Sequence, residues 1–115
     1  MSEFGNLLVG NSPRFGAMAE IVEAVATVYG VSTAAIIGRC RSKSIAEARQ
    51  VACLIARRCT RLSLPEIGRA VGCDHTTVMH GIKAAEQKCA ADRWLAAAVD
   101  ELLTTFGAGE ERVTQ

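Results

Sequence analysis

The chain has 115 residues, a net charge of +1 and a hydrophobic fraction of 50%, enough for one domain with little room for a second. No apolar run approaches the roughly 20 residues that span a bilayer. The N-terminus shows no charged segment followed by an apolar one, so we predict a cytoplasmic protein without a signal peptide. The composition is rich in alanine and only 4% aromatic, which favours packed helices.

The charge is distributed unevenly along the chain. Residues 38–61 carry seven basic side chains and one acidic one, whereas residues 92–115 carry five acidic and two basic ones. A basic middle is typical of a protein that contacts phosphates with one face. An ordinary solvated helix face gives the same pattern, so charge alone does not decide between them.

The cysteines are odd in number and form no CxxC pair, which argues against a disulfide framework. They are Cys40, Cys53, Cys59, Cys73 and Cys89. We expect most of them to be small core residues. His75 and His80 are five residues apart, a spacing that suits metal ligands on a helix poorly, so no metal site is predicted.

The N-terminal half contains three predicted helical segments. Residues 1–16 hold three glycines and Pro13, and we expect a flexible arm there. A helix over 17–29 places Ile21, Val25 and Val28 on one face, and Gly30 ends it. A short helical piece follows over 32–37, then a basic loop over 39–44.

A longer helix is predicted over residues 45–59. Its apolar residues recur at spacings of three and four, which gives a continuous apolar stripe. The stripe consists of Ile45, Ala48, Ala52, Ile55 and Cys59.

Residues 63–83 predict two helices joined by a tight turn. Ser63 can cap the first helix, Glu66 follows at the capping-box position, and Pro65 suits the first turn. Gly72 offers a left-handed exit, and Asp74 can cap the next helix. A helix-turn-helix of this kind places its second helix in the major groove of DNA.

The second helix of this motif opens with the polar residues Asp74, His75, Thr76 and Thr77. An aspartate can accept a hydrogen bond from cytosine, and threonine methyl groups can pack on thymine. Capping chemistry alone explains one or two of these residues. A polar stripe continues along the helix through Thr76, His80, Lys83 and Gln87.

The last predicted helix covers residues 92–106, with Leu95, Val99, Leu102 and Phe106 facing inward and Trp94 anchoring the edge of the core. Residues 107–115 are expected to form a disordered tail. Together these elements predict an all-α domain of about five helices over residues 17–106.

Four blocks of sequence carry a family resemblance: RSKS at 41–44, ARQ at 48–50, SLPEIG at 63–68 and DHTTVMH at 74–80. Over roughly residues 21–106 the chain resembles the C-terminal DNA-binding domain of the bacterial replication initiator DnaA. The resemblance implies a small helical domain whose recognition helix enters the major groove of a DnaA box. The sequence departs from the family pattern at two places. Its turn is one residue shorter and has Cys73 in place of an arginine, and it has Glu47-Ala48 where the family has Arg-Pro.

The resemblance also implies which residues contact DNA. A basic-loop arginine enters the minor groove, the head of the long helix touches the DNA, and the helix-turn-helix supplies the base-reading cluster. The predicted DNA-binding residues are Arg41, Lys43, Ser44, Arg49, Gln50, Leu64, Pro65, Asp74, His75, Thr76, Thr77, His80 and Lys83.

The sequence contains no GxxxxGK[ST] loop, so it predicts no Walker-type ATPase module, and no arrangement of side chains suggests catalysis. We therefore predict a stand-alone, non-enzymatic, nucleoid-associated protein without a cofactor. It would bind double-stranded DNA at a DnaA-box-like site and regulate replication initiation or transcription. It would not bind a membrane, and would compete with or contact the full-length initiator as a monomer or weak dimer.

Two alternatives stay open. The fold could serve as a protein-interaction module that docks on a replication or transcription protein without binding DNA. The chain could also be a domain cut from a longer initiator.

Overall fold

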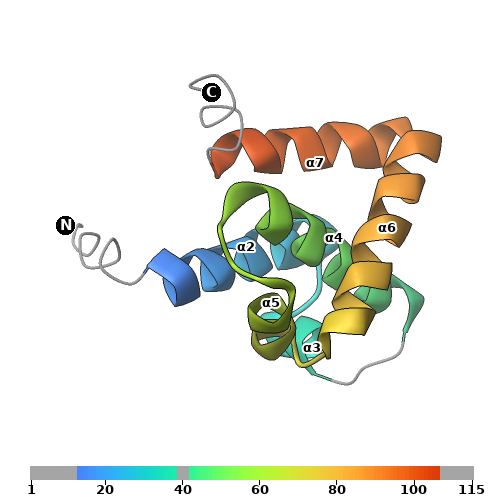
Figure 1. The fold of residues 1–115 in the computed structure, drawn as a ribbon. Coiled ribbons are helices and arrows are strands. Elements are labelled where there is room, and N and C mark those ends of the chain that lie inside the picture. Colours follow the sequence, from blue (N-terminus) through green and yellow to red (C-terminus); the bar gives the residue numbers. More distant parts are fainter. Residues whose placement is uncertain (1–12, 39–41, 107–115) are drawn as a thin grey trace.

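The computed structural model describes residues 13–38 and 42–106, and these contain six helices and no strand (Figure 1). The all-α prediction is confirmed, with the short piece near residue 35 standing as a sixth helix. Most of the predicted arm (1–16), the whole predicted tail (107–115) and Arg41 lie outside the described residues. The helices are α2 (Pro13–Tyr29), α3 (Thr33–Ile37), α4 (Lys43–Cys59), α5 (Leu64–Val71), α6 (His75–Ala91) and α7 (Arg93–Thr105).

Two helices begin earlier than the periodicity predicts. Helix α2 starts at Pro13 instead of residue 17, because a proline fits the first turn of a helix without losing a hydrogen bond. Helix α4 starts at Lys43 instead of residue 45. Its cap is Ser42, whose hydroxyl accepts a hydrogen bond from the Ile45 amide at 3.3 Å.

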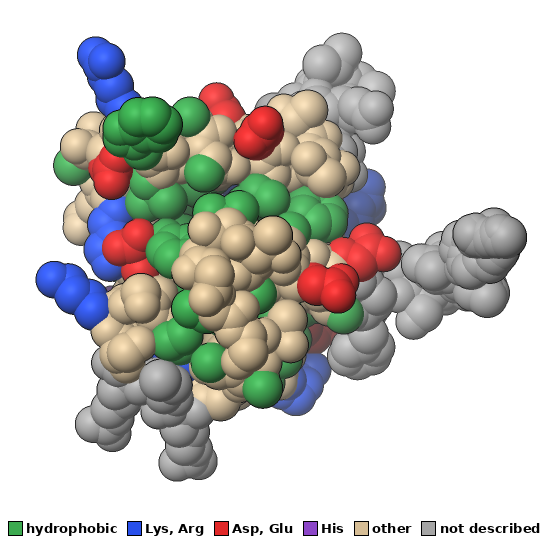
Figure 2. Space-filling model, turned by 180° about the vertical axis from the view of Figure 1, so that it is seen from behind, with side chains coloured by type: hydrophobic (Ala, Val, Ile, Leu, Met, Phe, Trp, Pro, Cys, Tyr) green, Lys and Arg blue, Asp and Glu red, His purple; other side chains and the backbone are tan. Residues whose placement is uncertain are grey.

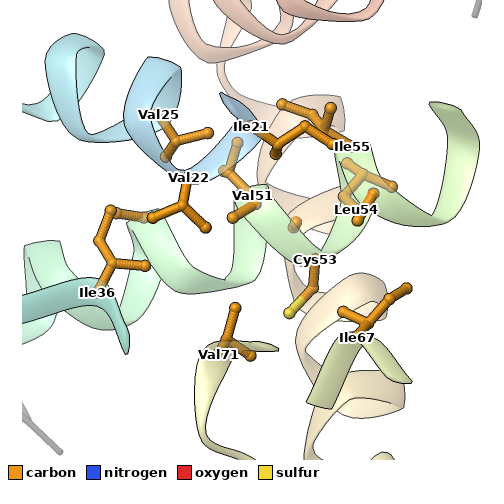
Figure 3. Packing of buried hydrophobic residues seen from close by; sticks show 14 of the residues in the cluster. Ile21, Val22, Val25, Ile36, Val51, Cys53, Leu54, Ile55, Ile67 and Val71 are labelled. Carbon is orange, nitrogen blue, oxygen red and sulfur yellow. The ribbon is translucent and has the colours of Figure 1, made fainter. Parts of the chain in front are cut away.

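Helix α4 runs through the centre of the fold, with α7 across one end of the molecule and α3 and α5 at the other (Figure 1). All six residues from 51 to 56 are buried, which a helix shows only when neighbours cover it all round. Side chains from α2, α3 and α5 converge on it, among them Ile21, Ile36 and Ile67 (Figure 3). The core therefore fixes where α5 and α6 lie.

Two predictions about apolar residues are wrong. Val28 is 51% exposed, because Tyr29 packs against the core at the end of α2 instead. Trp94 is 87% exposed and anchors nothing in the core. Helix α7 buries Leu95 and Val99, and each step along a helix turns the side chain by about 100°, so the residue before Leu95 points away.

The surface mixes residue types. Seen from behind, hydrophobic side chains lie between acidic and basic ones (Figure 2). Among the described residues, no helix combines the length and hydropathy that crossing a bilayer requires.

Candidate nucleic-acid interface

The first helix of the motif, α5, begins with the predicted capping box. The Ser63 hydroxyl accepts from the Glu66 amide at 3.2 Å, and the Glu66 carboxylate accepts from the Ser63 amide at 2.8 Å. Pro65 lies in the first turn. Local sequence signals therefore place the start of α5 correctly.

The turn of the motif depends on two glycines. Gly72 ends α5 with φ of +80°, and a Cβ atom there would lie 2.6 Å from the Ile37 carbonyl oxygen. A Cβ atom on Gly68 would clash with the Cys73 carbonyl oxygen. Because neither position carries a side chain, the end of α3 can lie against the turn at Gly72, and α5 can lie against the backbone of Cys73 at Gly68.

The second helix, α6, presents the predicted base-reading cluster at its N-terminus. Asp74 caps the helix, accepting from the Thr77 amide at 2.8 Å. The next three side chains, His75, Thr76 and Thr77, are all exposed, while Val78 is buried and anchors the helix to the core. The side chains of the first turn of α6 are therefore accessible to a ligand, and the helix N-terminus adds a partial positive charge there.

The cap couples protonation of the Asp74 carboxyl to folding, because the cap changes the pKa of that carboxyl. The hydrogen bond from the Thr77 amide lowers the pKa of the Asp74 carboxyl below its ordinary value. The stabilising contribution is therefore present above the unfolded pKa and is lost as pH falls through the folded one.

We expect Asp74→Asn to keep the cap, because asparagine accepts the same bond, while losing this pH dependence. Unfolding of both proteins by denaturant at several pH values tests this. The free energy of unfolding of the wild type should fall relative to Asp74→Asn below about pH 4. Parallel curves down to pH 2 would contradict it.

The N-terminus of α4 supplies a second electropositive element. Lys43 and Ser44, predicted to lie in a loop, form the first turn of the helix and are both exposed. The free amides of a helix N-terminus add partial positive charge to that of the lysine. This end of α4 follows the basic loop, whose Arg41 lies outside the described residues.

Arg49 is engaged within the protein. Its guanidinium group donates hydrogen bonds to the carbonyl oxygens of Ile36 at 2.6 Å, Gly38 at 3.0 Å and Ala35 at 3.2 Å. These carbonyls belong to the C-terminal end of α3, where a helix leaves acceptors unpaired. The Ile37 carbonyl faces Gly72, so the end of α3 lies between α4 and the turn of the motif.

Gln50 belongs to a polar cluster that joins α2, α4 and α6. The Lys88 ammonium group donates to the Gln50 side-chain oxygen at 3.1 Å and lies 3.7 Å from the Glu47 carboxylate. Glu47 also accepts from the Tyr29 hydroxyl at 2.6 Å. The acid that departs from the family pattern is thereby paired with a cation inside the protein.

A cleft of about 370 Å³ lies between parts of α4 and α6, which otherwise pack together, and predicted residues from both helices line it. Arg49 and Gln50 line it from α4, and Thr77 and His80 line it from α6. Cys53 lies at its base, where burial raises the pKa of the thiol to about 12.

Three other predicted contact residues do not line this cleft. Lys83 is exposed on α6, and Pro65 is exposed at the N-terminus of α5. Leu64 differs, because its side chain packs against the core. No group of three or more His, Cys, Asp or Glu side chains in the described segments is placed to hold a metal ion.

The profile of the bacterial DnaA helix-turn-helix matches residues 18–84, more than half of the chain. The chain belongs to the bacterial DnaA helix-turn-helix family. The match covers most of α2, all of α3 to α5 and the first ten residues of α6, so it includes residues 63–83, the predicted helix-turn-helix.

Full-length initiators show the same relationship. The chain is 43% identical over 84 residues to the chromosomal replication initiator protein DnaA of Neisseria meningitidis serogroup C. It is 44% identical over 86 residues to that of Cereibacter sphaeroides strain ATCC 17029. The matches cover 72% and 74% of this chain but only 16% and 19% of those relatives. The chain therefore corresponds to a small part of an initiator.

Solved structures agree with this placement. A crystal structure of a DNA replication initiation factor superposes with a TM-score of 0.72 at 33% identity, covering 90% of this chain and 32% of that one. A replication initiator DnaA bound to AMPPCP and single-stranded DNA gives a TM-score of 0.70 at 29% identity, covering 92% and 34%.

Proposed function

We propose that the protein binds double-stranded DNA at a DnaA-box-like site and acts as a non-enzymatic regulator of replication initiation or transcription. The observation that carries this proposal is the exposed first turn of α6. Its four polar side chains, Asp74 to Thr77, all point to solvent on a helix-turn-helix of the DnaA family.

In this proposal, residues of α6 contact the bases and residues at the start of α4 contact the sugar–phosphate backbone. The N-terminus of α6 enters the major groove, where Asp74, His75, Thr76 and Thr77 reach base edges and nearby phosphates. Lys43 and Ser44 at the start of α4 grip the phosphate backbone, and Arg41 enters the minor groove. His80 and Lys83 extend the contact along the polar stripe of α6.

Arg49 is better placed to hold the end of α3 than to contact a phosphate, because its guanidinium group is already hydrogen-bonded within the protein. Its three bonds to the end of α3 fix the position of that helix against Gly72. We propose that it acts mainly as a positioning residue, which keeps the turn and the start of α6 in place.

The experiment that tests the proposal is a fluorescence anisotropy titration with a duplex carrying a DnaA box and a scrambled duplex of the same length. Binding should be tighter to the box, and the affinity for both duplexes should fall steeply as salt rises, because cations are released from the phosphates. Equal affinity for both would contradict site recognition. Absence of binding to either at low salt would favour the alternative of a protein-interaction module.

Substitutions in the recognition helix should reduce discrimination between the duplexes. We expect Thr76→Ala or His75→Ala to lose about 1–3 kcal/mol on the box and much less on the scrambled duplex. The matched control is Arg57→Ala at the exposed end of α4, which should weaken binding to both duplexes alike. An equal loss on both duplexes for Thr76→Ala would remove it from the base-reading cluster.

A further inference from the structure

The outer face of α7 carries a large apolar side chain beside a depression. Trp94 is 87% exposed, and a shallow depression lies next to it along the same helix. The depression is lined by Trp94, Ala97, Ala98, Asp100, Glu101, Thr104 and Thr105. Exposing so large a side chain beside small residues is typical of an interaction surface.

The charges on this face are complementary to each other but unpaired. Arg93, Asp100 and Glu101 are exposed, and none of their side chains has a hydrogen bond or ion pair to another described residue. Arg93 precedes Asp100 by seven residues, two helical turns or about 10 Å. The Asp92 carboxylate beside Arg93 is bonded to the Trp94 and Leu95 amides. The charges of the face without a partner are therefore a cation near one end of the helix and two carboxylates near the other, which favours pairing with an antiparallel copy of the same helix.

We infer that a second copy of this chain docks here, with the two α7 helices antiparallel about a twofold axis near Ala97 and Ala98. Such an axis makes each surface patch its own partner. Trp94 of each copy then fills the depression of the other, where small residues leave room for the indole.

The same register satisfies the charges. With the axis near residues 97 and 98, Arg93 of one copy lies opposite residue 102 of the other, within one turn of Asp100 and Glu101. Two features, the shape of the face and its charge pattern, are thus compatible with the same register. The interface uses one helix face, less than the standard buried area of about 1,600 Å², so the dimer should be weak.

The dimer would give the proposed function a second property, and this part of the inference rests on that function. The N-terminus of α6 lies at the end of the molecule away from α7 (Figure 1). Pairing through α7 therefore directs the two recognition helices outward in opposite directions. A dimer of this form would hold two separate duplexes together.

The test of the dimer uses the whole chain without DNA. Sedimentation velocity over a range up to about 1 mM should show a monomer–dimer equilibrium. Trp94 is the one tryptophan of the sequence, so its emission should shift to the blue as the dimer forms. Trp94→Ala should stay monomeric with unchanged helical circular dichroism, because the indole contacts little of the fold.

A charge exchange makes the test specific. Arg93→Glu should weaken the dimer at least tenfold, and so should the double variant Asp100→Lys, Glu101→Lys. Combining all three substitutions should restore dimerisation, since the same pairs form with exchanged signs. A wild type that stays monomeric over the whole range, or a triple variant that fails to recover, would overturn the inference.

Bridging distinguishes this inference from the proposed function. Wild type should retain a labelled duplex on beads that carry a second duplex, whereas Trp94→Ala should bind single duplexes normally and retain none. Normal single-duplex binding by a wild type that does not bridge would overturn the outward-facing dimer alone. Loss of all duplex binding would overturn the proposed function and leave the sedimentation result to decide the dimer.

Discussion

Replacing Gly72 with alanine should destabilise the protein by about 2–5 kcal/mol. A left-handed backbone conformation costs an alanine about 1–2 kcal/mol, and φ at this position is +80°. The new Cβ atom would also lie 2.6 Å from the Ile37 carbonyl oxygen, and such overpacking costs about 1–3 kcal/mol more. Denaturant unfolding monitored by circular dichroism measures the loss.

Gly30 provides a matched control within the same chain. Its φ is +65°, but a Cβ atom there would meet nothing within 4 Å. Gly30→Ala should therefore cost only the backbone part, about 1–2 kcal/mol. Equal losses at the two positions would show that the turn does not press against α3. Gly72→Ala should also weaken binding to a DnaA box, whereas Gly30→Ala should not.

Arg49→Lys should be nearly as harmful as Arg49→Ala. Lysine keeps the charge but lacks the planar fork that bonds three carbonyls at once. Hydrogen bonds from a charged donor contribute about 1.5–3 kcal/mol each and are not additive here, so we expect each variant to lose about 2 kcal/mol of stability. Both should lose affinity for the box to a similar degree.

The salt dependence of binding separates positioning from phosphate contact. If Arg49 neutralised a phosphate, Arg49→Lys would retain most of the affinity, and Arg49→Ala would reduce the slope of log affinity against log salt by about 0.9. A positioning residue should leave that slope unchanged in both variants. Arg57→Ala, on the exposed side of the same helix, should change stability by no more than about 0.5 kcal/mol.

The helix ends of the motif could be predicted because the residues that determine each end lie only a few positions apart in the sequence. The Ser63 and Glu66 capping box, the left-handed Gly72 and the Asp74 cap all join positions at most four residues apart, and the structure confirms each of them. Hydrogen-bonding preferences at helix ends decide such features whatever the tertiary contacts are.

The partners of Arg49 and Glu47 could not be predicted in this way. Arg49 bonds to residues 11 to 14 positions earlier, and Glu47 meets Tyr29 and Lys88, which lie on other helices. Only the packing of α2, α3 and α6 on α4 brings these groups together. Trp94 shows the same limit, because an apolar residue beside a buried stripe is placed by helical phase and not by its hydropathy.

Selection of bound sequences from a random duplex pool tests the central claim most directly, that the exposed start of α6 reads base pairs. Several rounds at low ionic strength should enrich one short asymmetric motif related to a DnaA box, and His75→Ala should relax it at specific positions. A pool that stays random after selection, or that wild type and His75→Ala enrich identically, would contradict that claim.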